Sequence, residues 1–324
     1  TVTIESAGNA PRSHRRPEPP ADLPAPAAPI VDAADVTIRL TGIGGTGVVT
    51  VSQILGTAAM LAGRDVRGLD QTGLSQKAGP VVSDVRISRH RDDRPTTSNH
   101  ANVGGVGALL AFDLLVGAAD SNLAECRAGR TVVVASTAAV PTGQMVTHPD
   151  IAAPPAAALI ERVEQVSRAA DNRYLDAAAL TEALLGSTTT ANIMVLGAAL
   201  QIGAVPVPVD AVERAIELNG VAVETNLAAL RWGRAWAVDP AGVERAADLP
   251  GAVAPETLDE LIDRLAIDLV AYQSPAYAER FRSVVDRARC AETSVEPTST
   301  RFSAAVARNL HKLMAYKDEY EVAR

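Results

Sequence analysis

The chain has 324 residues, a formal net charge of −8 and 47% hydrophobic residues. This length predicts about two domains, and the apolar fraction is sufficient for a core. The acidic balance argues against a nucleic-acid partner, and neither a membrane-spanning apolar run nor an apolar secretory signal is present in the sequence, so we expect a cytoplasmic protein.

The first part of the chain alternates predicted strands and helices after a proline-rich start. Residues 1–35 are rich in proline and alanine, which predicts a semi-extended, mobile linker or tail. Apolar runs and alternating patterns predict strands at 36–42, 65–70, 81–88, 108–117 and 131–137. Helices are predicted at about 48–61, ending near Gly63, and at 120–129.

After residue 150 apolar residues recur at helical spacing. The predicted helices lie at 156–170, 176–185, 191–204, 208–218 and 221–237. Strand–helix alternation followed by helices predicts the α/β class, with a three-layer Rossmann-like sheet domain over 36–239 and a helical C-terminal region over 240–324.

The C-terminal region carries two further helix signals. Ser274 and Pro275 have the residue types of an N-cap and a first helical residue. Residues 301–324 predict an amphipathic helix whose apolar face needs a partner outside this chain; this face includes Phe302, Val306, Leu310 and Leu313.

A glycine-rich turn follows the first strand. Gly42, Gly44 and Gly47 have the G-x-G-x-x-G spacing of a dinucleotide-binding loop, and Asp70 ends the second strand, where an acidic residue would take the ribose. However, the loop 71–79 leads directly into another strand, which breaks the expected βαβ unit. The broken unit argues against a dinucleotide site, so a free-standing NAD(P)- or FAD-binding protein is kept only as the alternative interpretation.

Two stretches carry a family resemblance. GIGGTGVVTVSQILGTAAMLAG (42–63) and LDQTGLSQKAGPVVSDVRIS (69–88) resemble the gamma domain of 2-oxoacid:ferredoxin oxidoreductases, and the similarity is greatest to the fused, single-chain indolepyruvate type. Residues 219–234 and 271–289 also resemble that type, and residues 305–324 resemble the start of its C-terminal domain. This resemblance implies a partial protein, whose helical C-terminal domain, starting at residue 240, is truncated.

The resemblance also implies a reaction, in which a 2-oxo acid, coenzyme A and oxidised ferredoxin give acyl-CoA, carbon dioxide and reduced ferredoxin. Thiamine diphosphate with Mg²⁺ and 4Fe–4S clusters would lie in partner domains, and the whole enzyme is expected to be a homo-oligomer. A cluster usually takes four thiolates, whereas Cys126 and Cys290 are the two cysteines of this chain. We therefore expect no cofactor bound by this chain alone, and no catalytic or metal-ligating residue in it.

Two loops contain the candidate binding residues: Gly42, Gly44, Gly45 and Gly47 in the first, and Gly73, Ser75, Gln76, Lys77 and Gly79 in the second. The resemblance implies that the second loop faces the thiamine and coenzyme A region. There, Lys77 would meet a phosphate as a point charge, and Ser75 and Gln76 would hydrogen-bond the acyl or pantetheine part. A contact loop without a ligand, in a domain that only packs the complex together, is the other interpretation. Ser136 and Thr137 end a predicted strand, where doubly wound sheets often place ligands.

Overall fold

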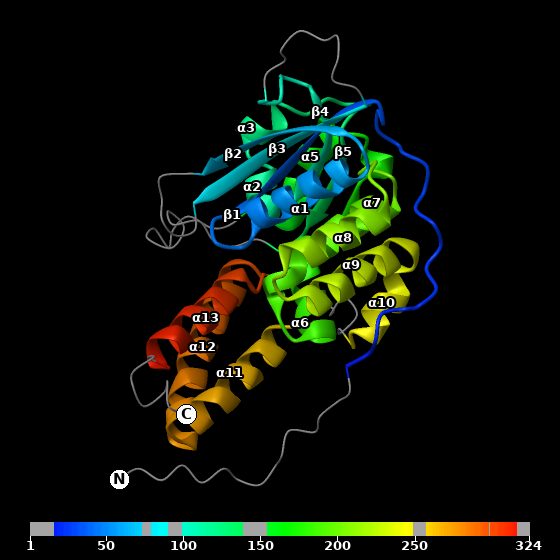
Figure 1. The fold of residues 1–324 in the computed structure, drawn as a ribbon. Helices are drawn as coiled ribbons and strands as arrows, with labels where there is room; N and C mark the ends of the chain where they lie inside the picture. Colours follow the sequence, from blue (N-terminus) through cyan, green and yellow to red (C-terminus); the bar gives the residue numbers. More distant parts are fainter. Residues whose placement is uncertain are drawn as a thin grey trace. The chain divides into compact units, whose positions relative to one another are not determined.

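The computed structural model describes residues 16–72, 79–89, 99–138, 154–248, 257–297 and 299–315. The chain divides into two compact units between Leu249 and Pro250. The first unit contains a sheet with helices on both faces, and the second contains three helices (Figure 1). Within the described ranges, no helix is long and apolar enough to span a membrane.

The sheet of the first unit has six strands: β1 (Asp35–Ile43), β2 (Asp65–Thr72), β3 (Pro80–Ser88), β4 (Val106–Ala111), β5 (Val132–Ser136) and β6 (Arg173–Leu175). Their order across the sheet is β2-β3-β1-β4-β5-β6. β1, β4, β5 and β6 are parallel, whereas β3 is antiparallel to both β1 and β2. The short loop after β2 therefore returns the chain as a hairpin, and β3 separates β2 from β1.

The predicted strand at 108–117 is too long. β4 ends at Ala111, and the rest of the segment forms the short helix α2 (Leu114–Gly117). Asp113 causes the change of structure, because its carboxylate accepts a hydrogen bond from the Val116 amide at 2.9 Å and thereby caps the helix.

Helices cover both faces of the sheet, which confirms the predicted α/β class. α1 (Val48–Leu61) and α7 (Ala191–Gln201) lie on one face, with α8 (Val209–Asn219) and α9 (Val223–Val238) packed against them. The other face carries α2, α3 (Asp120–Leu123) and α5 (Ala156–Gln165). α6 (Ala177–Leu185), α10 (Pro240–Ala246) and the 3₁₀ turns η1 (Ala169–Asp171) and η2 (Thr188–Thr190) complete the unit.

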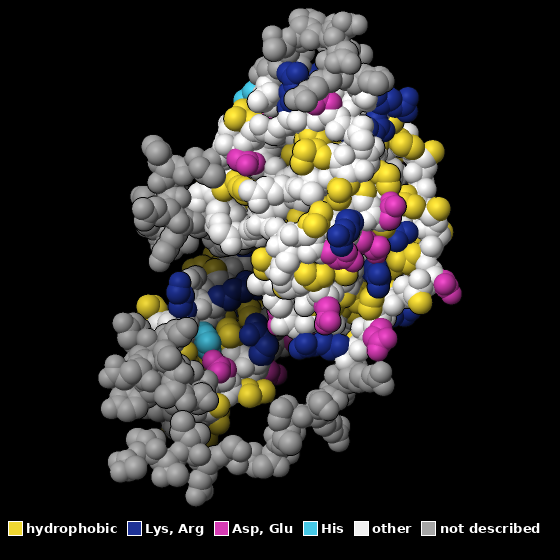
Figure 2. All heavy atoms as spheres, in the orientation of Figure 1, with side chains coloured by type: hydrophobic (Ala, Val, Ile, Leu, Met, Phe, Trp, Pro, Cys, Tyr) yellow, Lys and Arg dark blue, Asp and Glu magenta, His cyan; other side chains and the backbone are white. Residues whose placement is uncertain are grey.

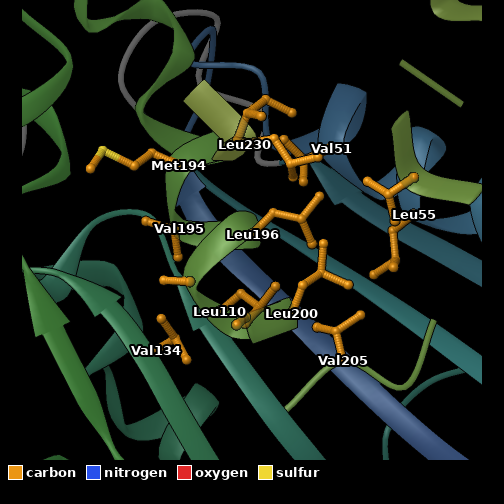
Figure 3. Close-up of a cluster of buried hydrophobic side chains, with 14 of the residues drawn as sticks. Val51, Leu55, Leu110, Val134, Met194, Val195, Leu196, Leu200, Val205 and Leu230 are labelled. Carbon is orange, nitrogen blue, oxygen red and sulfur yellow. The ribbon is translucent and has the colours of Figure 1, made fainter. Parts of the chain in front are cut away.

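The larger core lies between the sheet and α7, whose side chains are almost all buried. Figure 3 shows Leu196 and Leu200 of α7 beside Leu110 of β4, with Val51 and Leu55 of α1 on the other side of them. Trp232 and Trp236, one turn apart on α9, are buried in the same core.

A buried ion pair lies on the opposite face of β1. Arg39 and Asp84 are directly opposite each other on β1 and β3, and both are almost completely buried. The guanidinium donates from Nε to Oδ1 at 2.8 Å and from Nη2 to Oδ2 at 2.9 Å. Burial alone would lower the pKa of Arg39, but the hydrogen bonds and charge of Asp84 raise it above its ordinary value.

Residues 23–34, which we call the strap, pack against the first unit ahead of β1. We expected a mobile segment here; the strap is extended, but its Ala27 and Ile30 amides donate to the Gln201 and Gly203 carbonyls at 2.9 and 3.0 Å. Ile30, together with Leu23 and Val31, also packs against the larger core. Proline removes donors but leaves carbonyls free, and the Pro24 carbonyl accepts from Gln201.

The surface carries charges of both signs. On the face drawn in Figure 2, acidic and basic side chains are interspersed over α8 and α9 rather than gathered by sign. Arg231 of α9 and Glu213 of α8 form one such pair at 3.3 Å.

The second unit consists of α11 (Leu258–Tyr272), α12 (Pro275–Val295) and α13 (Arg301–Met314). The predicted start of α12 is confirmed, because the Ser274 side chain accepts from the Tyr277 amide and Pro275 is the first helical residue. The core of this unit includes Leu265 and Phe281.

The expectation that α13 needs a partner outside the chain is wrong for its described part. α13 packs on α11 and α12 through the small buried residues Ser303 and Ala307, which allow close approach. Val306 and Leu310 of the predicted apolar face also contact this core. Phe302 and Leu313 remain exposed, so the contacting face is rotated relative to the predicted one.

Candidate functional site

The glycine loop joins β1 to α1 through two left-handed residues. Gly45 has a φ of 87° and Gly47, the N-cap of α1, has a φ of 92°, which are conformations that glycine adopts without strain. At Gly42 the backbone approaches the helix so closely that a Cβ would lie 2.8 Å from Val48 Cγ2. The predicted strand–turn–helix geometry of this loop is therefore present.

Several hydrogen bonds hold the glycine loop. The Thr46 hydroxyl donates to the Ile43 carbonyl at 2.7 Å, and Asn192 Nδ2 of α7 donates to the Thr46 carbonyl at 2.8 Å. The Gly44 amide donates to the Gly79 carbonyl at 2.8 Å. The last contact brings the end of the second predicted loop against the first.

Gly79 is buried beside the glycine loop, whereas Gly73, Ser75, Gln76 and Lys77 lie outside the described residues.

A crevice opens at the carboxyl ends of β1, β4 and β5. Its volume is about 610 Å³, within the range of about 300–1,000 Å³ that is usual for small-molecule sites. It is lined by Ile43, Gly45, Thr46, Gly47, Phe112, Asp113, Ser136, Ala138, Ala178, Thr188, Thr189, Ala191 and Asn192. The chain leaves β1 toward one side of the sheet and β4 toward the other, so the crevice lies at the topological switch point where α/β proteins bind ligands.

The polar groups that line the crevice differ in burial and in charge. The Ser136 side chain is 2% exposed and lines the crevice. Asp113 is 4% exposed and is the one ionisable side chain among the lining residues. At the glycine loop no side chain caps α1 and no acidic residue lies in its first turn, so its first amides favour a negatively charged group.

Asp70 does not occupy the ribose-binding position of a dinucleotide site. Asp70 pairs with Ser83, which in turn pairs with Leu40, so Asp70 lies two strands from β1, at about 10 Å by ordinary strand spacing. Its carboxylate also accepts a hydrogen bond from Ser52 of α1 at 3.3 Å. The structure therefore gives Asp70 a place on the sheet face rather than at the crevice.

The sequence identified only part of the crevice. It indicated the glycine loop and Ser136, but Thr137 does not line the crevice; its amide donates to the Leu175 carbonyl. Phe112 and Asp113 were assigned to a strand, although an aspartate after an apolar run is a cap signal that could have been used. Thr188, Thr189 and Asn192 come from the helical half of the chain, and no local pattern indicated them.

The two cysteines belong to different units. Cys126 is buried behind the sheet, where burial raises the pKa of its thiol to about 11, whereas Cys290 is exposed on α12 in the second unit. Among the described residues, no group of three or more His, Cys, Asp or Glu side chains could hold a metal ion.

Comparison with known families gives two matches. The family described as pyruvate ferredoxin/flavodoxin oxidoreductase matches residues 37–236. A family of unknown function (DUF6537) matches residues 258–324.

Individual relatives match over smaller or more distant regions. Indolepyruvate oxidoreductase subunit IorB from Thermococcus kodakarensis and from Pyrococcus horikoshii are each 42% identical over 53 residues, which is 16% of this chain and 26% of theirs. The chain thus matches about a quarter of the length of these curated relatives.

Solved structures with a similar arrangement include the gamma subunit of keto/oxoacid ferredoxin oxidoreductase from Geobacter sulfurreducens, with 22% identity, a TM-score of 0.44 and coverage of 63% of this chain and 98% of that one. Pyruvate oxidoreductase subunit PORC from Thermotoga maritima has 20% identity, a TM-score of 0.43 and coverage of 62% and 96%.

Proposed function

We propose a function from the following premise: the chain belongs to the pyruvate ferredoxin/flavodoxin oxidoreductase family. Its sheet unit is the gamma-type domain of a cytoplasmic, thiamine-dependent 2-oxoacid:ferredoxin oxidoreductase of the indolepyruvate type. That enzyme converts a 2-oxo acid and coenzyme A into acyl-CoA and carbon dioxide and passes the electrons to ferredoxin. The main support for this proposal is that the family match extends over nearly all of the sheet unit.

The indolepyruvate type is supported by the local identity to IorB. We infer that loop 73–79 contacts coenzyme A, and the contact between Gly44 and Gly79 supports this role by fixing one end of the loop on the glycine loop. The residues of the chain do not fit the redox groups of the reaction: a cubane cluster takes four thiolates, and the two cysteines lie in different units. We therefore assign no chemical step to this chain; thiamine-binding and cluster-bearing domains, and ferredoxin, are its proposed partners.

The test uses the complete native enzyme that contains this chain, isolated through a tag on the chain. Indolepyruvate should reduce a viologen dye only when coenzyme A is present, and indolyl-acyl-CoA should accumulate. The 324-residue chain alone should reduce no dye. Dye reduction by the chain alone, NAD⁺ reduction in place of dye reduction, or inactivity of the complete enzyme toward a panel of aryl and alkyl 2-oxo acids would contradict the proposal.

A further inference from the structure

A second pocket lies at the opposite edge of the sheet from the crevice. It opens at the amino ends of β1 and β4, next to the turn that leads into β5. The strap and the start of β1 form one wall, and the turn before β5 forms the other. Its volume is about 350 Å³, which is enough for a small ligand. Nothing in the proposed oxidoreductase function uses this edge of the sheet.

The charged side chains of this pocket are mostly basic. Three arginines and two aspartates line it: Arg127, Arg130, Arg168, Asp32 and Asp35. Asp35 accepts from both Nε and Nη2 of Arg86, at 2.8 and 2.6 Å. Arg168 is also engaged, because Nη1 donates to the Ile30 carbonyl at 2.6 Å and Nη2 lies 2.5 Å from the Asp171 carboxylate.

Arg127 and Arg130 differ from the other charged groups of the pocket. Within the described ranges, neither guanidinium forms a hydrogen bond or an ion pair. Asp32, the remaining lining carboxylate, accepts from the Ala34 amide at 2.9 Å. Although the chain as a whole carries a formal charge of −8, this pocket therefore keeps two uncompensated cations against one carboxylate. Its charge attracts an anion.

The turn that carries both arginines is fixed to the sheet. The Arg127 amide donates to the Thr131 hydroxyl at 2.9 Å, and that hydroxyl donates to the Val106 carbonyl of β4 at 2.7 Å. The Arg130 amide closes the turn by donating to the Arg127 carbonyl at 3.1 Å. The stem of Arg127 lies along Gly104, where an added Cβ would come within 3.4 Å of it. Little backbone order therefore has to be gained when an anion binds.

Two guanidinium groups on one fixed turn match a doubly charged oxyanion, because each can donate two parallel N–H groups to it. A phosphate group carries a charge of about −1.5 to −2 near pH 7, whereas a carboxylate carries a single negative charge. We propose that this pocket binds the phosphate group of a small molecule, either free phosphate or a phosphate monoester. Arg127 and Arg130 hold its oxygens, and the bound group lies between their turn and the strap.

The test measures binding to the 324-residue chain by calorimetry at low salt. It needs no turnover, so its outcome is independent of the proposed oxidoreductase function. The probes are inorganic phosphate and sn-glycerol 3-phosphate, with glycerol as the uncharged comparison. At least one of the two phosphates should bind saturably, and the tighter of them identifies the source of the group. Glycerol should not bind, and added salt should weaken the binding of phosphate because the arginines are exposed.

Matched variants test the two arginines. Arg127→Gln and Arg130→Gln keep most of the stem but remove the charge, and each should weaken phosphate binding at least about five-fold. Arg130→Glu should abolish it. The control is Arg89→Gln, at an exposed arginine of the same sheet edge that does not line the pocket. It changes the net charge equally and should change the affinity less than about two-fold.

Hydrogen exchange reports where the anion binds. Because the strap forms one wall, phosphate should slow exchange over residues 27–36, and it should not do so in Arg130→Glu. Circular dichroism shows that each variant is folded; if Arg127→Gln does not fold, the Arg130 variants carry the test. Three results would overturn the proposal: no saturable binding of either phosphate, an equal loss of affinity in Arg89→Gln, or binding that leaves exchange in the strap unchanged.

Discussion

At the scale of single residues, the proposed contact with coenzyme A depends most on Lys77. If this lysine meets a phosphate of coenzyme A, Lys77→Ala in the complete enzyme should raise the KM for coenzyme A several-fold, since losing one exposed charge–phosphate contact costs about 1 kcal/mol. The KM for the 2-oxo acid should change less. Lys312→Ala, an exposed lysine of α13, is the matched control. Equal changes in both KM values, or none, would favour a contact loop without a ligand.

The two cysteines should differ in reactivity, because only a thiolate is a good nucleophile. Burial raises the pKa of Cys126 to about 11, so its thiol stays protonated below that pH. In the native chain at pH 8, a disulfide reagent should label exposed Cys290 first and Cys126 much more slowly, and the rate at Cys126 should increase as the pH rises toward 11. Both should react alike in denaturant. Similar native rates at pH 8 would show that Cys126 is accessible.

At the scale of elements, α7 and α9 cross at two glycines. A Cβ on Gly197 of α7 would lie 2.2 Å from the Leu230 carbonyl oxygen, which belongs to the backbone and cannot rotate away. Gly197→Ala should therefore lower the free energy of unfolding by about 1–3 kcal/mol, despite the better helix propensity of alanine.

The matched change is Gly56→Ala in α1, where the nearest atom to the new Cβ is Val66 Cγ1 at 3.6 Å. This variant should be neutral or more stable by up to about 1 kcal/mol. Urea unfolding measures both, and equal effects would contradict the close crossing.

The start of α13 depends on one carboxylate of α12. Glu292 accepts hydrogen bonds from the Ser299 and Ser303 hydroxyls and from the Phe302 and Ser303 amides. Burial alone would raise the pKa of Glu292, but these hydrogen bonds lower it to about 2. The stabilisation of α13 is therefore complete above the ordinary pKa of 4.5 and is lost as the pH falls toward 2.

Hydrogen exchange tests this dependence. Glu292→Gln should speed exchange over residues 301–314, whereas Glu296→Gln, at an exposed carboxylate one turn away, should not. Unchanged protection in Glu292→Gln would mean that packing alone holds α13.

The elements also show what sequence can predict. The hairpin of β2 and β3 followed from the short loop between two strand patterns, and α1 followed from its glycine turn. β6 was missed because three residues cannot show a periodicity, and they lie between helical segments. The crevice was found only in part, because it joins residues near 43, 112, 136 and 190, and nothing local in the sequence relates those four positions.

At the scale of the whole molecule, the order of the strands argues against the binding of a dinucleotide cofactor. Because β3 lies between β1 and β2 and is antiparallel to both, the described sheet has no parallel strand on that side of β1 to carry the ribose ligand of a dinucleotide site. Titration with NADH, followed by its fluorescence, should show no saturable binding. Saturation in the micromolar range would restore the dinucleotide-binding interpretation.

The strap has a mechanical consequence. Tension arriving along the chain from before residue 16 must first break the contacts of residues 23–34 with α7 and its neighbours before it reaches β1. The Ala27 and Ile30 hydrogen bonds to the Gln201 and Gly203 carbonyls lie ahead of β1 in the chain, so they bear such a pull before the strand does. A pull on the preceding residues is therefore taken up first by the strap, and only afterwards by β1 and the glycine loop that follows it.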